Sequence, residues 1–159
     1  MADETLLMLV REIRGKTLKQ LADVGPEQAR FAPAGLVNSV LWHAGHILVV
    51  NEHLGVVAAT HGTPSYPAGY FETFSWKSAP ATVTDWPELR DVIKLLEEQK
   101  AKLEHFVAGA PEEVLAGVTD PARGRTLRYS ILHGLHDEAG HQGEIHLLKK
   151  LWTKQNTPI

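Results

Sequence analysis

Residues 131–148, Ile131-Leu-His-Gly-Leu-His-Asp-Glu-Ala-Gly-His-Gln-Gly-Glu-Ile-His-Leu-Leu148, decide how the rest of this chain is interpreted. The stretch holds four of the nine histidines of the protein, together with two adjacent carboxylates. Its periodicity is helical, which places Asp137 and His141, four positions apart, on one face of a helix. Two ligand-type side chains at this spacing can reach one metal ion, as in H-E-x-x-H motifs. We therefore expect a metal-ligating pair here, with a third ligand supplied from elsewhere.

The composition indicates one globular domain over residues 1–159, with 43% apolar and 22% charged residues. A net charge of −3 gives no reason to expect a nucleic-acid partner. The chain has no cysteine, which excludes disulfides and thiolate sites and leaves only nitrogen and oxygen ligands for an ion. No apolar run approaches about 18 residues and no signal-peptide pattern is present, so we expect a cytoplasmic protein without a membrane partner.

Four periodic segments predict helices at residues 3–24, 38–60, 85–109 and 126–152. The expected N-terminal caps are Asp3, Asn38, Thr126 and a capping-box variant at Asp85-Trp-Pro-Glu88. Connectors rich in proline and glycine separate the helices, and the longest irregular stretch is residues 62–83. Since no segment favours a strand, the pattern predicts an all-α antiparallel four-helix bundle. The long loop between its second and third helices could form a crossover.

The second helix offers candidates for the third ligand. Leu41-Trp-His-Ala-Gly-His-Ile47 places His43 and His46 three positions apart, and His53 follows on the same face two turns later. His46 and His53 would lie about 10 Å apart along the axis, so both cannot bind one ion. We expect one of these histidines to complete the site, because facing helices of a bundle commonly share one. A hydrogen-bonded network or exposure at the mouth of the bundle are the alternatives for the ionisable stripe.

The motifs Trp42-His-Ala-Gly-His-Ile47 and Asp137-Glu-Ala-Gly-His-Gln-Gly-Glu-Ile145 together resemble the DinB-like family of metal-binding four-helix bundles. The resemblance covers nearly the whole chain. It implies that His46 and His141 are ligands, with a further ligand four residues before His141. That position is usually His, or Glu in the mycothiol-dependent branch, and here it is Asp137. The resemblance also implies activities such as low-molecular-weight-thiol transfer or mycothiol-dependent isomerisation, although many relatives have no known reaction.

Two imidazole nitrogens and one carboxylate oxygen leave positions open for water or substrate, which is typical of a catalytic rather than a structural site. Zn²⁺ or Ni²⁺ is the first expectation, with Fe²⁺ or Mn²⁺ open because such ligands discriminate poorly. A metal-bound water could hydrolyse a small molecule, or the ion could activate a low-molecular-weight thiol. We therefore expect a metal-dependent hydrolase or thiol transferase that forms a homodimer. The alternative is a non-catalytic metal-binding, dimer-forming bundle with a stress-response or interaction role.

Several residues receive supporting interpretations. Glu138, three residues before His141, is the alternative carboxylate ligand. Residues that could support the site without being primary ligands are His43, Glu138 and Glu144, the last as an acceptor that orients a ligand imidazole. Arginines that could contact an anionic substrate, or simply form a solvated basic loop end, are Arg123, Arg125 and Arg128. Aromatic residues that could wall the pocket, or only pin the long loop, are Tyr66, Tyr70, Phe71 and Trp76.

Overall fold

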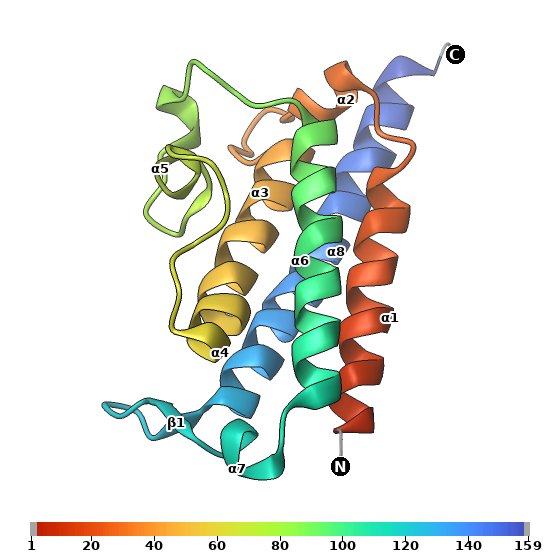
Figure 1. The fold of residues 1–159 in the computed structure, drawn as a ribbon. Coiled ribbons are helices and arrows are strands. Elements are labelled where there is room, and N and C mark those ends of the chain that lie inside the picture. The colour runs from red at the N-terminus through yellow and green to blue at the C-terminus, as the bar shows by residue number, and fades with distance from the viewer. Residues whose placement is uncertain (1–2, 158–159) are drawn as a thin grey trace.

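The structure is a computed structural model that describes residues 3–157. Its long helical segments are α1 (Glu4–Leu21), α3 (Val40–Asn51), α6 (Leu89–Gly109) and α8 (Leu127–Asn156). They run side by side (Figure 1), and each packs against two others: α1 against α6 and α8, and α3 against α8 and α6. In the described part of the chain, no helix is long and apolar enough to cross a bilayer.

The directions of the helices differ from a fully antiparallel arrangement. α1 and α8 run one way and α3 and α6 the other, because residues 61–88 return along the length of the molecule before α6 begins (Figure 1). Each long helix therefore has one antiparallel and one parallel neighbour. The predicted antiparallel packing therefore fails between α1 and α8 as well as between α3 and α6, and the long connection forms the crossover that its length allowed.

The helix starts follow local hydrogen bonding. Asp3 and Thr126 accept hydrogen bonds from backbone N–H groups three residues ahead, as predicted. The cap of α3 is Ser39 and not Asn38, since the Ser39 hydroxyl accepts from the N–H of Trp42 at 3.3 Å. The capping box expected before α6 is wrong, because the residue at its N-cap makes no side-chain cap hydrogen bond.

The second long helix changes its winding after α3. It widens into a π-helical segment, Glu52–Val57, and closes with α4 (Ala58–Thr60) before His61, which has a left-handed φ of 54°. Hydrophobic periodicity predicted the end of this helix but not the π-helical turn. Side chains beyond Asn51 are consequently rotated away from the positions that a regular α-helix would give them.

Short elements occupy stretches that were expected to be irregular. They are α2 (Pro26–Arg30), α5 (Tyr70–Phe74), a 3₁₀ turn (Pro80–Thr82), α7 (Glu112–Leu115) and the antiparallel hairpin β1 (Val118–Asp120) and β2 (Arg125–Thr126). The expectation of no strand was therefore wrong. Helices and strands this short carry too few residues to show a period. Gly124, with a φ of 63°, supplies the left-handed residue in the hairpin turn.

The core consists of two apolar clusters with a polar layer between them. One cluster holds buried residues such as Leu41, Leu96 and Ile145, and the other holds Val10 and Leu103 among its members. Along each long helix, buried polar side chains separate the residues of one cluster from those of the other. These polar residues are Arg14, Thr17, Asn51, Glu52, Gln99, Glu138 and Gln142. Burying charges requires partners, so this layer has to be fully paired within the chain.

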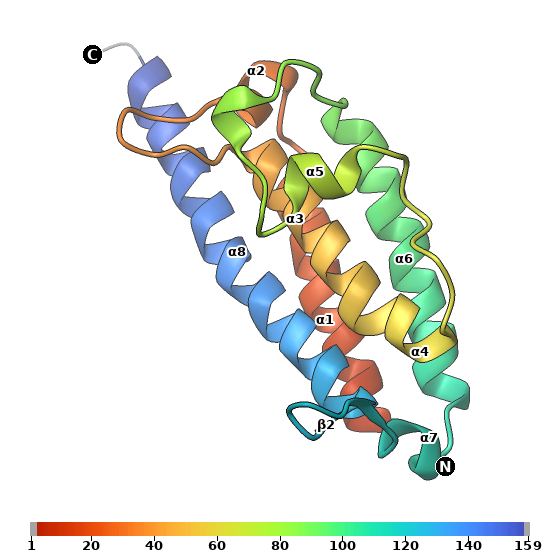
Figure 2. The same cartoon turned by 90° about the vertical axis from the view of Figure 1, so that its left-hand side faces the viewer.

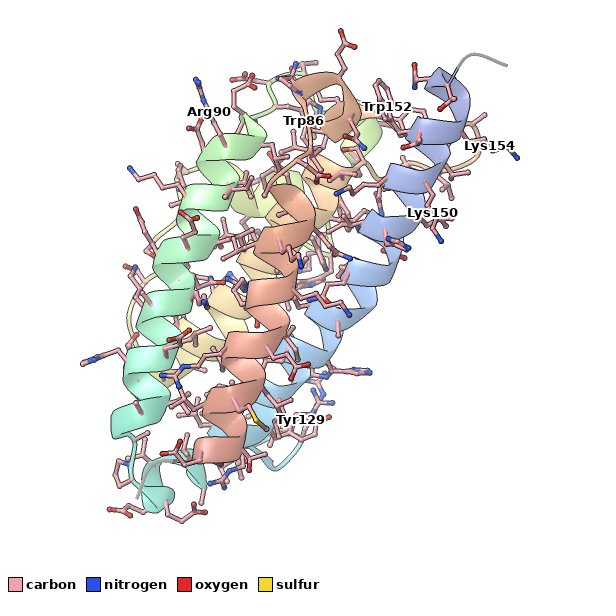
Figure 3. All side chains as sticks on the ribbon, turned by 90° about the vertical axis from the view of Figure 1, so that its right-hand side faces the viewer. Trp86, Arg90, Tyr129, Lys150, Trp152 and Lys154 are labelled. Carbon is pink, nitrogen blue, oxygen red and sulfur yellow. The ribbon has the colours of Figure 1, made fainter. Side chains whose placement is uncertain are left out.

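The pairing in this layer centres on Arg14. Its guanidinium donates to both carboxylate oxygens of Glu138, at 2.8 and 3.0 Å, and to the side chain of Gln99. Thr17 donates to Glu138 at 2.6 Å and Asn51 donates at 3.2 Å. The layer therefore ties α1, α3, α6 and α8 together at mid-height. Figure 3 shows the side chains of the four helices, with Tyr129 and Trp152 marking opposite ends of α8.

Candidate metal centre

Three expected ligand side chains converge between α3 and α8, directly beside the polar layer. The Oδ2 atom of Asp137 lies 3.9 Å from Nε2 of His46 and 3.6 Å from Nε2 of His141. One ligand atom from each residue falls within 4.8 Å of the other two. Ligand atoms placed tetrahedrally at 2.0–2.1 Å from Zn²⁺ lie about 3.4 Å from one another. The three side chains therefore fit a divalent ion after small movements that bring their ligand atoms closer together.

The protonation of the two imidazoles follows from their other contacts. Nδ1 of His46 lies 2.6 Å from the carbonyl oxygen of Phe74, which can only accept, so Nδ1 carries the proton. Nδ1 of His141 lies 3.0 Å from a carboxylate oxygen of Glu144, and an Nδ1–H donating to that oxygen leaves Nε2 of His141 free in the same way. Each Nε2 is left with a free lone pair directed toward Asp137. Such a backbone or carboxylate partner is typical of histidines that ligate metals.

The carboxylate between these lone pairs has an unusual environment. Oδ2 of Asp137 is buried and has no hydrogen-bond partner among the described residues. Buried polar atoms in proteins are nearly always paired, and an unpaired one costs about 1–3 kcal/mol. Here three acceptors face one another with no donor between them. A cation satisfies all three at once, and this is the chemical reason why the residues present fit a metal ion.

The His46 imidazole is held from both sides. It stacks on the Trp42 indole with ring centroids 4.6 Å apart, and the indole N–H donates to Ser78. α5 comes close enough to bring the Phe74 carbonyl into reach because residue 45 is glycine: a Cβ there would lie 2.3 Å from the Phe74 ring. Burial lowers the pKa of His46, while the hydrogen bond to Phe74 partly opposes that shift. The ligand is therefore neutral and oriented at pH 7.

A second group surrounds the other nitrogen of His141. Nδ1 of His43 lies 2.9 Å from Nδ1 of His141, and both lie 3.0 Å from Oε2 of Glu144. Burial, with a smaller contribution from the neighbouring histidines, lowers the pKa of His43 to about 3. His43 is therefore neutral at pH 7. The structure places His43 and Glu144 beside the His141 imidazole, where the Glu144 carboxylate can accept a hydrogen bond from Nδ1–H of His141.

Two other expected candidates lie apart from this group. Glu138 is fully buried, and Arg14 and its polar neighbours occupy both of its oxygens, so it is unavailable to an ion at Asp137. His53 belongs to the π-helical segment, and its Nε2 lies 2.8 Å from the Tyr66 hydroxyl. Neither residue belongs to the converging set. The contact of His46 with a backbone carbonyl was missed by sequence reasoning, because a carbonyl leaves no signal in residue identity.

Comparison with known proteins identifies the fold. A sequence model of the DinB superfamily matches residues 9–145. The chain belongs to the DinB superfamily. Among solved structures, the crystal structure of the conserved protein of locus from Enterococcus faecalis matches with a TM-score of 0.76 and 19% identity. That match covers 95% of this chain and 97% of the other, and shows a shared fold. No curated protein matches this chain.

The remaining candidates of this DinB protein have separate environments. Arg123 pairs with Asp120 at 3.0 Å, and Arg128 pairs with both Asp3 and Glu112. Arg125 instead lies over an aromatic ring at the start of α8. Among the aromatic residues of the long connection, Tyr70 is buried in the core, and Trp76 is 59% exposed. Tyr66 and Phe71 lie partly buried around His53, so this group pins the connection to the second helix.

Proposed function

We propose that this DinB-superfamily protein is a divalent-metal-dependent enzyme acting on a small molecule, as a hydrolase or a low-molecular-weight-thiol transferase. His46, Asp137 and His141 would hold the ion, with Zn²⁺ or Ni²⁺ the first choices. The observation that carries the proposal is the meeting of two imidazole nitrogens with a buried carboxylate oxygen that has no hydrogen-bond partner among the described residues. An ion held by two nitrogens and one oxygen keeps open positions and acidifies a water or thiol bound there.

The surroundings of the centre support a small organic substrate. A pocket of about 160 Å³ adjoins His43 and Glu144, and its other lining residues, from α8 and from the segment before α3, are apolar except for Asn38. Two of these side chains, Leu36 and Val37, are exposed despite being apolar. Glu144 is itself largely exposed at this pocket, and its carboxylate lies within hydrogen-bond distance of Nδ1 of His141. An apolar wall with polar groups converging at one end is typical of small-molecule sites.

The second candidate function is a non-catalytic metal-binding dimer. The exposed apolar side chains of Tyr129 and Leu132, on adjoining turns of α8, favour an interface there. Such a protein would bind the same ion through the same ligands but would perform no turnover. The two functions therefore differ in what reaches the ion, and not in which residues hold it.

Metal stoichiometry tests the ligand assignment. The protein would be loaded with Zn²⁺ or Ni²⁺, freed of unbound ion and analysed beside His46→Ala, Asp137→Ala and His141→Ala. We expect about one ion per chain in the unaltered protein and loss of most of it in each variant. The matched control is His136→Ala, an exposed histidine on the same helix, which should bind as the unaltered protein does. Full metal content in His141→Ala would refute the proposal.

A second measurement separates the enzyme from the non-catalytic dimer. Water-proton relaxation of the Mn²⁺-loaded protein reports whether solvent exchanges at the ion. Rapid exchange, together with metal-dependent turnover of thiol-transfer or ester substrates that His141→Ala abolishes, supports an enzyme. A tightly held ion without solvent exchange, in a protein that sediments as a dimer, supports the non-catalytic alternative.

A further inference from the structure

A second group of possible metal ligands surrounds the nitrogen of His141 that faces away from Asp137. It consists of His43 of α3 with His141 and Glu144 of α8. The Nδ1 atoms of His43 and His141 lie 2.9 Å apart, and each lies 3.0 Å from Oε2 of Glu144. Figure 2 shows α3 and α8 side by side, which is why side chains from both helices reach one point. The candidate metal centre uses Nε2 of His141, so the two groups share one ring through different nitrogen atoms.

Hydrogen bonds alone do not satisfy all three contacts in this group. An imidazole nitrogen donates when it carries a proton and accepts when it does not. If both Nδ1 atoms carry protons, both donate to Glu144, and two N–H groups then face each other across 2.9 Å. If only one of them does, the other nitrogen presents its lone pair to the carboxylate oxygen across 3.0 Å. Each arrangement leaves a repulsive contact, whereas a cation placed among the three atoms attracts all of them.

The donor atoms of this group match the requirements of a divalent ion. Tetrahedral ligand atoms of Zn²⁺ lie about 3.4 Å from one another, so these three atoms need to separate only slightly. His43 is neutral at pH 7 because it is buried, as a metal-ligating imidazole has to be. Glu144 is largely exposed and gives an ion a route from solvent. The pocket of about 160 Å³ adjoins both His43 and Glu144, which leaves room for water or a ligand on such an ion.

We propose that His43, His141 and Glu144 form a second divalent-metal site, whose ion is joined to the first one through the His141 ring. This inference goes beyond the proposed function, because the second group can hold an ion whether or not the first is filled. When both are filled, each nitrogen of His141 is a ligand, and the proton of the ring leaves to solvent. Asp137, Glu144 and the deprotonated ring then set three negative charges against the four positive charges of the ions. The second ion should bind more weakly, since it requires this proton loss and one of its ligands is exposed.

The number of zinc ions bound by the full chain tests the proposal. Titration calorimetry would follow binding into an excess of Zn²⁺, without removal of unbound ion. We expect a tight step and a weaker step in the unaltered protein. Glu144→Gln should weaken the second step by at least about tenfold, because even residues that only contact a metal ligand change the affinity by about 10–100-fold. His43→Asn should have the same effect. The matched control, Glu97→Gln, alters an exposed carboxylate on α6 and should keep both steps.

Magnetic coupling tests the shared ring. Imidazole also suits Cu²⁺, and two Cu²⁺ ions bound to one ring are coupled. The electron paramagnetic resonance signal per bound copper should therefore fall as the second ion binds to the unaltered protein. Glu144→Gln should keep the signal of isolated ions. A full signal from two bound copper ions in the unaltered protein would overturn the joined site.

His46→Ala separates this inference from the proposed function. It removes a ligand of the first centre only, so the weaker step should remain, and adding Glu144→Gln should abolish that step. If the unaltered protein binds an ion that survives His46→Ala and is lost in Glu144→Gln, the second site stands and the ligand assignment of the proposed function fails.

Two other results would overturn the second site. One is equal zinc binding by the unaltered protein, Glu144→Gln and His43→Asn, since any second step would then come from exposed histidines elsewhere. The other is a single step that Glu144→Gln weakens and His46→Ala abolishes, because Glu144 would then only orient His141.

Discussion

Replacing Asp137 by asparagine should make the protein more stable than the unaltered protein when no metal is bound, and less stable than the unaltered protein when metal is bound. Without an ion, Asp137 places a buried, unpaired oxygen between two imidazole lone pairs. An amide of the same shape can donate a hydrogen bond to one of those nitrogens. We therefore expect metal-free Asp137→Asn to be more stable than the metal-free unaltered protein. This is the opposite of the usual effect of altering a partly buried residue.

The sizes of the two effects can be worked out. An unpaired buried polar atom costs about 1–3 kcal/mol, and the partial exposure of the Asp137 side chain favours the lower end, so we expect a gain of about 1 kcal/mol. An ion at 100 times its dissociation constant stabilises the unaltered protein by about 2.7 kcal/mol. If Asp137→Asn binds about 100-fold more weakly, the same ion concentration adds only about 0.4 kcal/mol. The unaltered protein should then be the more stable by about 1 kcal/mol.

Denaturant unfolding, followed by tryptophan fluorescence in chelator and in excess Zn²⁺, measures all four free energies of unfolding. The control is Asp85→Asn, which removes an exposed carboxylate and should leave the ion-induced gain unchanged. The reasoning is refuted if Asp137→Asn is less stable than the unaltered protein in chelator while gaining equally from the ion. That result would mean that the Asp137 carboxylate is satisfied by the protein itself and contributes nothing to metal binding.

Three further perturbations follow from the same geometry. Gly45→Ala should lower the free energy of unfolding in denaturant by about 1–3 kcal/mol, because the added methyl group would meet the Phe74 ring. Adding Phe74→Leu should restore most of the lost stability. Full stability of the single variant would contradict the close approach of Phe74 to residue 45. Glu138→Gln should lower the free energy of unfolding by about 3–5 kcal/mol, because Arg14 would stay buried without a counter-charge. In the double variant Glu138→Gln with Arg14→Met, losses that simply add would exclude coupling between the two residues. Burial lowers the pKa of His43 to about 3 in the folded protein, against about 6.5 in the unfolded chain. As the pH drops below about 6.5, the unfolded state binds a proton that the folded state does not, so the free energy of unfolding falls. Between pH 7 and pH 5 in chelator, the unaltered protein should lose about 2 kcal/mol more than His43→Asn, and parallel pH profiles would contradict the lowered pKa.

The sequence predicted the long helices because each presents a sustained apolar stripe of helical period. It did not predict the π-helical turn after Asn51, since widening a helix by one residue leaves the local hydrophobic pattern almost intact. Packing explains the change: Gly55 lies close enough to Leu103 that a Cβ there would be 2.8 Å from that side chain, and Glu52 faces inward to the polar layer. The π-helical turn therefore occurs where the second helix packs closely on α6. The sequence of the second helix alone does not show where α6 will lie, so it could not predict this turn.

The direction of α6 was open for a similar reason. A connection of 62–83 is long enough either to turn back at once or to cross the molecule, and loop length alone does not decide between them. In the structure, Glu52 decides part of the path by accepting hydrogen bonds from the N–H and hydroxyl groups of Ser65. A buried carboxylate on the second helix thus anchors the start of the crossover. That pairing joins residues 13 positions apart and has no sequence motif.

The choice between Asp137 and Glu138 shows what the sequence could have settled. Adjacent residues on a helix point about 100° apart, so only one of the two carboxylates can face a given neighbour. α1 carries the missing clue, because Arg14 and Thr17 interrupt an apolar stripe at positions that otherwise face the core. A buried arginine requires a buried carboxylate, and Glu138 meets that requirement. Asp137, one position away, makes no ion pair with a lysine or arginine within residues 3–157. Its charge is therefore available to the proposed ion, and the buried ion pair of the core lies directly beside the candidate metal centre.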